Sequence, residues 1–301
     1  MKQAFDYHQA FARTLGWITE SEQAILRGAR IAIAGLGGVG GSHLLTLARL
    51  GVGAFHISDF DHFELSNMNR QVGASVSHLG LAKVEVLARM ARGVNPELDL
   101  RCFPEGVDKT NVDAFLDGVD LHVDSLDFFA FEARRMLYAA CEARGIPTVS
   151  VGPLGMGAAM ICFLPGKMSF EEYFRWEGQT EEEMALRFLV GLAPSMLQST
   201  YLVDPSRLNL SGHRGPSTPM GCELCAGVAA TEALKILLRR GKVHAAPHAI
   251  HFDAYLNKLT HTWRPGGNRN PLQRLVLYFA RRRMVKMRAA ASAGAAPTVT
   301  R

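Results

Sequence analysis

Residues 35–71, GLGGVGGSHLLTLARLGVGAFHISDFDHFELSNMNRQ, decide the fold. They follow the short apolar run RIAIA of residues 30–34, which is typical of a buried strand, and they continue into helical periodicity at 39–50. Glycine permits a tight turn and lets backbone approach a phosphate closely. The start of the next helix offers unpaired N–H groups to that anion. The stretch therefore predicts a nucleotide-binding strand, turn and helix.

The predicted nucleotide ligands lie in this turn and after the next strand. Asp59 ends the predicted strand at 54–58, about 20 residues after the turn, where a carboxylate binds ribose hydroxyls. Asp61 follows in the same acidic loop and is also assigned to nucleotide binding. The alternative is a glycine turn that only packs a helix onto the sheet. The backbone contacts to phosphate are assigned to Gly35, Gly37, Gly38 and Gly40.

A polar cluster then follows that a nicotinamide-dependent dehydrogenase does not need. Arg70 presents a fixed fork of donors that suits phosphate oxygens. Lys83 lies at the start of the next predicted helix, 80–93, and can reach the same phosphates, although alone it reads as an exposed helix lysine. Two cations at one polyphosphate favour a reaction at phosphorus over hydride transfer. The neighbouring side chains expected to orient the nucleotide are Asn67, Asn69 and Gln71.

Two acids end the predicted strand at 121–125, in the sequence VDSLD. Ligands of open α/β sheets bind beyond the carboxyl ends of the strands. A carboxylate that faces phosphates there needs a cation between them, and Mg²⁺ keeps several waters, so one protein carboxylate can hold it. We assign Asp127 to Mg²⁺. Asp124 lies near the same edge and is instead expected to cap the next helix, predicted at 128–145.

Strand and helix patterns alternate from residue 30 to 152, which predicts an α/β fold. We expect a Rossmann-like, mainly parallel sheet with helices on both faces, a smaller mixed or antiparallel extension and a C-terminal basic helix. Residues 156–165 are predicted as an edge strand, and residues 165–221 as irregular. The predicted divisions are a helical extension (1–28), a nucleotide-binding domain (29–165), a crossover and substrate loop region (166–221), a completing helix and strand (222–263) and a partly disordered basic tail (264–301).

The net charge of +5 is unevenly distributed. Residues 254–301 contain ten of the 33 Lys/Arg and none of the 28 Asp/Glu, so the first 253 residues carry a net charge of −5. Such a tail can contact nucleic acid, anionic lipid or an acidic protein, or it can be an ordinary exposed helix. Its predicted apolar stripe, which would pack on the body or anchor at a membrane surface, is Leu272, Leu275, Val276 and Phe279.

The remaining composition favours a cytoplasmic protein. No apolar run reaches the ~18 residues of a membrane span, and the first residues do not resemble a secretory signal. An odd number of cysteines without a regular framework is typical of a reducing compartment. The five are Cys102, Cys141, Cys162, Cys222 and Cys225.

Together these motifs resemble the ThiF/MoeB/HesA family, the bacterial relatives of ubiquitin-activating enzymes. The resemblance covers about residues 10–165 and 221–255 and rests on GLGGVGG, SDFDHFELSNMNRQ, the lysine of GLAKVEV, NPELDL and VDSLD. It implies an ATP- and Mg²⁺-dependent adenylyltransferase. Such an enzyme activates a carboxylate, usually the C-terminus of a ubiquitin-like or sulfur-carrier protein, as acyl-AMP and releases pyrophosphate.

The resemblance also implies residue roles. It places Asp59 on the ribose, Arg70 and Lys83 on the phosphates and Asp127 on Mg²⁺. The family forms homodimers and uses an early arginine that often reaches into the partner's site, for which Arg13 is the candidate. Phe128 stands where the family usually has a polar residue, which leaves the detail of the nucleotide contacts open.

The cysteines depart from the family pattern. Several members hold a structural zinc on two CxxC pairs, whereas Cys222 and Cys225 form one pair here. One pair cannot complete a tetrahedral site without help from His or another subunit, so zinc is not expected. The pair remains a candidate acyl acceptor or redox pair, with a purely structural role at a helix start as the alternative. The crossover segment 163–221 contains no cysteine that could form a thioester.

Three other functions stay open at this point. A related branch of the superfamily activates a threonylcarbamoyl carboxylate on transfer RNA, and other members adenylate peptides or small molecules; the basic tail keeps the RNA branch in view. A non-catalytic nucleotide-binding adaptor is a second alternative. A nicotinamide oxidoreductase is a third, although the phosphate-directed cluster argues against it. The sequence does not identify the carboxylate.

Overall fold

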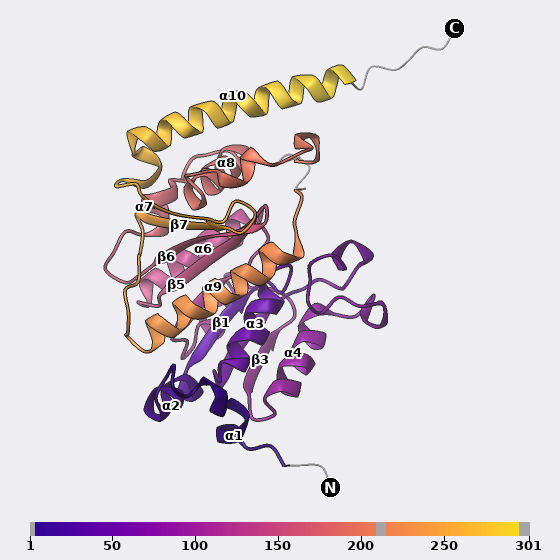
Figure 1. Cartoon of the computed structure of the whole chain (residues 1–301), viewed down its shortest axis with the longest axis vertical. Helices are drawn as coiled ribbons and strands as arrows, with labels where there is room; N and C mark the ends of the chain where they lie inside the picture. Colours follow the sequence, from indigo (N-terminus) through magenta and orange to yellow (C-terminus); the bar gives the residue numbers. More distant parts are fainter. Residues whose placement is uncertain (1–3, 209–214, 295–301) are drawn as a thin grey trace.

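The computed structural model describes residues 4–208 and 215–294, with side chains described up to Val285. Its centre is an eight-stranded sheet of order β3-β2-β1-β4-β5-β6-β7-β8 (Figure 1). Strands β3 to β5 in this order are parallel, and β6, β7 and β8 extend the sheet in antiparallel fashion. This confirms the predicted fold class. The strands are β1 Arg30–Ala34, β2 Ala54–Ser58, β3 Asp99–Phe103, β4 Leu121–Asp124, β5 Thr148–Leu154, β6 Gly157–Phe163, β7 His248–Asp253 and β8 Lys258–Trp263.

The register of the three central strands decides where the site lies. Ala34 is level with Ser58 of β2 on one side and with Asp124 of β4 on the other. Because these strands are parallel, the loops that follow them leave the sheet side by side at one edge. Strand order reverses between β2 and β4 around β1, and such a switch point is where open α/β sheets bind ligands.

Helices cover both faces of the sheet. The apolar sides of α3, α4 and α9 join one core with the strands, in which Leu44, Leu87 and Ala229 are fully buried. On the other face, α5 and α6 bury Phe115 and Leu137 against the sheet. Here the bounds are α3 Gly40–Arg49, α4 Lys83–Val94, α5 Val112–Phe115, α6 Phe131–Ala143 and α9 Pro219–Leu237.

The N-terminal residues form the expected helical lead-in, with α1 at Tyr7–Phe11 and α2 at Glu20–Gly28. A reciprocal capping box between Thr19 and Glu22 begins α2. The Tyr7 hydroxyl donates to the carbonyl of Gly51, which precedes β2. The lead-in therefore lies at the amino edge of the sheet, opposite the loops that follow β1, β2 and β4.

Three expectations about the second half are wrong. Residues 165–221 are not simply irregular, because α7 (Phe170–Phe174) and α8 (Glu181–Leu192) form there, each capped by a Ser or Thr side chain. They enclose an aromatic core with Phe163 and Trp176.

Strand β6 is not an edge strand, because it lies between β5 and β7, and β8 is the edge. Helix α9 begins six residues earlier than predicted, at Pro219 behind the Thr218 cap.

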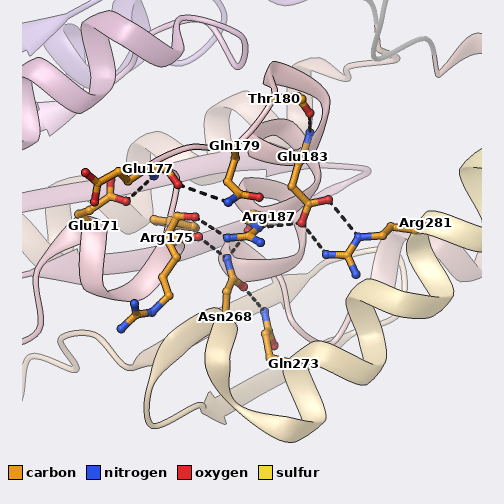
Figure 2. Close-up of polar contacts among 11 residues, drawn as sticks. Glu171, Arg175, Glu177, Gln179, Thr180, Glu183, Arg187, Asn268, Gln273 and Arg281 are labelled. Carbon is orange, nitrogen blue, oxygen red and sulfur yellow. Dashed lines mark hydrogen bonds and ion pairs between the residues drawn. The ribbon is translucent and has the colours of Figure 1, made fainter.

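The basic tail begins as α10, Pro271–Gly294, which packs on α8 (Figures 1 and 2). The predicted apolar stripe is wrong at Leu272, Leu275 and Phe279, which are exposed, whereas its fourth member, Val276, is partly buried against α8. Leu277 packs instead against Leu186 and Val190 of α8. Within the described residues, none of the helices combines the length and the apolar character that crossing a bilayer requires.

Polar contacts fix α10 at both ends of this interface, and Figure 2 shows the end at Arg281. The buried Gln273 donates to the carbonyl of Val190 over 2.8 Å. The Glu183 carboxylate accepts from Arg187 Nε over 2.7 Å and from Arg281 Nε over 3.0 Å. A single acid of α8 thus joins an arginine of its own helix to one of α10.

Candidate functional site

The glycine turn after β1 is packed against the loop that follows β4. Gly35 has a φ of +86°, and a Cβ there would lie 2.4 Å from the carbonyl oxygen of Ser125. A Cβ on Gly40 would lie 1.9 Å from the carbonyl oxygen of Gly35. Only glycine fits either position. The loops after β1 and β4 therefore touch directly at the sheet edge.

Asp59 is fastened to this turn. Its Oδ2 accepts a hydrogen bond from the Leu36 N–H over 2.7 Å, and its Oδ1 accepts one from the Asp61 N–H over 2.8 Å. Burial raises the pKa of Asp59, against the opposing effect of the two N–H donors and the charge of Lys83. The carboxylate is thus held in one orientation at the carboxyl end of β2, with oxygen lone pairs left for a further donor.

Lys83, the first residue of α4, points toward the same place. Its Nζ lies 3.0 Å from Asp61 Oδ2, and its side chain is only 6% exposed, whereas that of Asp61 is 55% exposed. The backbone N–H of Lys83 also donates to the Asp61 carbonyl over 2.9 Å. Lys83 is therefore not an ordinary surface lysine. Leu36, Asp59, Asp61 and Lys83 form one chain of contacts from the glycine turn to the ammonium.

Arg70 folds back over the glycine turn. A Cβ on Gly38 would lie 3.5 Å from Arg70 Nε, and the nearest atom to one on Gly37 would be Nε2 of Gln71. Arg70 Nη1 donates to the Ser66 carbonyl and to Asn69 Oδ1, each over 3.0 Å. Its guanidinium is half-buried and has no acidic partner among the described contacts. It is thus a cation that a phosphate can engage.

The two asparagines of the cluster serve different purposes. Asn67 is buried, and its Oδ1 accepts from the Glu64 N–H, so it shapes the loop. Asn69 is exposed and donates through Nδ2 to the Ser217 carbonyl over 3.1 Å. Ser217 lies in the segment that enters α9. Asn69 therefore ties the Arg70 loop to the part of the chain that follows residues 209–214.

Asp124 and Asp127 are in opposite environments. Asp124 is buried, pairs with Arg134 Nε over 2.9 Å and accepts from the Tyr138 and Ser150 hydroxyls. Burial raises the pKa of Asp124, but Arg134, His122 and these hydrogen bonds together hold it below its usual value. Asp127 is exposed, and among the described residues its carboxylate accepts a hydrogen bond only from the Phe129 N–H, over 2.9 Å. Asp127 is therefore the acid at this edge that is available to a cation.

Arg134 is a residue of this site that the sequence analysis missed. It is buried on α6 and donates to the carbonyls of Leu126, Asp127 and Phe128 as well as to Asp124. Its guanidinium also lies over the Phe188 ring of α8, 4.6 Å from the centroid. The signal was its helical spacing to Leu137 and Tyr138, which places a charge on the buried face. Arg134 fixes the loop that presents Asp127.

Cys222 and Cys225 lie on the first turns of α9 and are both fully buried. Cys222 Sγ would be 3.2 Å from a Cβ on Gly38, so the thiol packs beneath the glycine turn. Burial raises the pKa of Cys222 and raises that of Cys225 further, which keeps both as thiols. In the described part of the chain, no His, Asp or Glu joins them in a metal-binding group. His213, the nearest candidate in sequence, lies outside the described residues.

Arg13 does not reach this site within one chain. It lies on an exposed turn, Ala12–Thr14, after Phe11, which contacts Gly51 at the amino edge of the sheet. The glycine turn is at the carboxyl edge. Any contact between Arg13 and a nucleotide must therefore involve a second chain.

A separate cavity of ≈ 1170 Å³ lies between α7, α8 and α10, in the region of Figure 2. None of its lining residues belongs to the glycine turn or to the loops after β2 and β4. Its charge is mixed, with acids from the α7 region, but arginines predominate. They are Arg175, Arg187, Arg269, Arg274 and Arg281.

Comparison with known families gives one match that covers most of the chain. The model described as "ThiF family" matches residues 11–275. Over 150 residues the chain is 33% identical to the tRNA threonylcarbamoyladenosine dehydratase of Escherichia coli strain K12, which is 50% of this chain and 55% of that protein. Over 127 residues it is 36% identical to the SAMP-activating enzyme E1 of Haloferax volcanii, or 42% of this chain and 46% of that one.

The matched region thus spans about half the length of these curated relatives. Among solved structures, that of E. coli MccB with ATP superposes with a TM-score of 0.59 at 20% identity, covering 80% of this chain and 65% of that one. At this level of identity the likeness concerns the fold.

Proposed function

The chain belongs to the ThiF family, and from that premise we propose that it is an ATP- and Mg²⁺-dependent adenylyltransferase. The proposed reaction joins a carboxylate oxygen of the substrate to the α-phosphorus of ATP. The bond from that phosphorus to the β-phosphate oxygen breaks, so the products are acyl-AMP and pyrophosphate. Carbon is neither oxidised nor reduced, and no proton transfer is needed.

One observation carries this proposal: two cationic side chains and an exposed acid converge on the glycine turn. Arg70 packs over Gly38, Lys83 connects to the turn through Asp61 and Asp59, and Asp127 follows Ser125, which touches Gly35. The ATP-bound MccB structure shares the fold and supports the choice of nucleotide. An NAD-dependent reaction has no use for this set of charges.

Each residue has a distinct proposed task. Asp59 binds the ribose, the backbone of the glycine turn contacts phosphate, and Arg70 and Lys83 neutralise the charge that develops on the leaving pyrophosphate. Asp127 would hold Mg²⁺ through a carboxylate oxygen, and the ion would supply positive charge to the phosphates. Arg70 bonds Ser66 and Asn69 through Nη1 alone, so its Nε and Nη2 donors are left for phosphate oxygens.

The substrate we favour is the C-terminal carboxylate of a ubiquitin-like or sulfur-carrier protein. Support comes from the similarity to the SAMP-activating enzyme E1, whose name describes activation of such a protein. We further propose a homodimer, in which Arg13 of each chain reaches the partner's nucleotide. A cytoplasmic location remains a prediction from the sequence.

A second candidate substrate is a carboxylate on transfer RNA. It is favoured by the similarity to tRNA threonylcarbamoyladenosine dehydratase and by the arginines of α10 and of the cavity beside it. Binding of this kind would weaken steeply with salt, because phosphate contacts release counterions. A carrier protein held by a few contacts would show a weaker salt dependence.

Substrate capture with ATP tests both candidates. The chain is incubated with ATP, Mg²⁺ and cell extract divided into protein and RNA fractions, and mass spectrometry identifies an adenylated species in one of them. Carboxylate-dependent pyrophosphate exchange then confirms the reaction with the purified substrate. ATP binding without exchange by any fraction would instead indicate a non-catalytic adaptor, and NAD binding without a Mg²⁺ requirement would indicate an oxidoreductase.

A further inference from the structure

Three histidines gather at the far end of the sheet, away from the glycine turn. His248 begins β7, His261 lies on β8, and His244 lies in the connection that follows α9. Each contributes one ring nitrogen to a group in which all such atoms lie within 4.8 Å of one another. It is the one group of three or more metal-ligating side chains found among residues 4–208 and 215–285.

The strand register explains why these side chains meet. His248 pairs with Trp263 and Ile250 pairs with His261, so His248 and His261 are diagonal neighbours on one face of the β7–β8 hairpin. The parallel bridge between Cys162 and Ala245 holds the connection beside β6 and brings His244 to the same face. Three backbone segments thus contribute one imidazole each.

The nitrogen separations suit a small divalent ion. His261 Nε2 lies 3.0 Å from His248 Nδ1, and the His244 ring centroid is 4.2 Å from that of His261 and 5.4 Å from that of His248. Ligands about 2.0–2.1 Å from a tetrahedral ion lie roughly 3.4 Å apart. Small rotamer changes at the hairpin surface bring the three nitrogens to that spacing.

From this geometry we propose that His244, His248 and His261 form a binding site for a divalent transition-metal ion, with Zn²⁺ as the best-suited ion. Neutral imidazoles are ligands for zinc, copper and nickel. Three protein ligands leave a fourth position to water. The ion would join the α9–β7 connection to the edge hairpin, and so hold the end of the sheet together. The expectation that zinc is not bound rested on the cysteines alone and does not apply to these histidines.

Few charges surround the three histidines. Burial, the neighbouring histidines and Lys242 lower the pKa of His244 and of His248. Lys242 is exposed and solvated, and the Lys235 ammonium is paired with Glu232 and donates to the Lys242 carbonyl. One solvated ammonium is therefore the main opposing charge, and water screens it.

Calorimetric titration of the full-length chain, without a polyhistidine tag, with Zn²⁺ at pH 7.5 tests the site. We expect one ion per chain, and at least tenfold weaker binding in His244→Ala and in His261→Ala, because even outer-shell changes cost about 10–100-fold in metal affinity. His8→Ala, an exposed histidine on α1, is the control and should bind like the wild type. Affinity should fall at pH 5.5, because protons compete with the metal ion for the ligand nitrogens.

X-ray absorption at the zinc edge identifies the ligands independently of the variants. Nitrogen ligands at about 2.0–2.1 Å support the proposal, and sulfur ligands at about 2.3 Å would assign the ion to cysteines instead. Unchanged zinc binding in both histidine variants would overturn it, as would no zinc binding by the wild type. Neither result bears on adenylation, because these residues are remote from the glycine turn.

Discussion

Asp124 and Asp127 are three residues apart, and the structure gives them opposite tasks. Asp124→Asn removes the charge that compensates the buried Arg134, so we expect a loss of about 3–5 kcal/mol in the free energy of unfolding. Asp127→Asn changes an exposed side chain and should stay within about 0.5 kcal/mol of wild type, while losing Mg²⁺-dependent pyrophosphate exchange. Urea unfolding and exchange assays measure the two effects. Equal stability losses in both variants would contradict the assignment.

Arg70 offers the sharpest test of the phosphate site. Arg70→Ala removes a donor that we place on the phosphates, and we expect carboxylate-dependent pyrophosphate exchange to fall by ~10²–10³-fold with the fold intact. Arg89→Ala, an exposed arginine of α4, is the matched control and should keep wild-type exchange. Near-normal exchange in Arg70→Ala, with circular dichroism unchanged in both variants, would remove Arg70 from the mechanism.

Two buried histidines should make the protein sensitive to acid. Burial lowers the pKa of His43 and of His122 to about 4 each, so the unfolded chain binds their protons first, near pH 6.5. Their contribution is fully present above pH 6.5 and is lost as pH falls toward 4, by up to about 1.4 kcal/mol per pH unit for each histidine. Urea unfolding between pH 7 and 5 measures this slope. We expect His122→Gln to flatten it, and an unchanged slope would exclude His122 as a contributor.

The residues of the site could largely be predicted from the sequence, because they follow strands whose ends the pattern locates. Asp59, Arg70, Lys83 and Asp127 all lie at the predicted edge. Arg134 was missed because its role depends on carbonyl groups of a loop whose path no pattern specifies. Their chemical roles remain predictions until the variants are assayed.

At the scale of the element, α10 gives the clearest test of helix packing, because one side of the helix is buried and the other is exposed. Leu277 is 2% exposed against α8, and Phe279 is 59% exposed. We expect Leu277→Ala to cost about 2–4 kcal/mol of unfolding free energy through a buried cavity. Phe279→Ala should cost less than about 0.5 kcal/mol. Thermal unfolding of both variants measures these losses of stability. A larger loss of unfolding free energy in Phe279→Ala would mean that the helix packs through its other side.

The elements that the sequence analysis missed share a physical cause. Helix α8 follows the Thr180 cap and begins with three glutamates, a start signal that a segment rich in acids obscured. Strand β8 has mostly exposed side chains and lacks the apolar pattern of a buried strand. Three of the four predicted stripe residues of α10 were misassigned because apolar residues lie on both sides of the helix, and the buried Gln273 marks the side that packs. The parallel strands were easier to predict from the sequence, because burial on both faces gives continuous apolar runs.

At the scale of the whole molecule, the placement of Arg13 leads to a mixing experiment. If Arg13 acts in the partner's site, a dimer of one Arg13→Ala chain and one Lys83→Ala chain has one doubly impaired site and one intact site. Random mixing then restores about a quarter of wild-type exchange from two inactive parents, because half of the dimers are mixed. Exchange after subunit remixing measures this, with ultracentrifugation to establish the dimer. No recovery from a stable mixed dimer would place Arg13 outside the partner's site.

The amide of Asn69 joins two segments of the candidate site. Its oxygen accepts from Arg70 and its nitrogen donates to Ser217, so one side chain couples the phosphate loop to the lead into α9. A nucleotide that draws Arg70 Nη1 onto its phosphates would leave the Asn69 side chain held by its bond to Ser217. We therefore expect nucleotide to change the rate at which a protease cleaves the chain just before α9. In Asn69→Ala that rate should be the same with and without nucleotide.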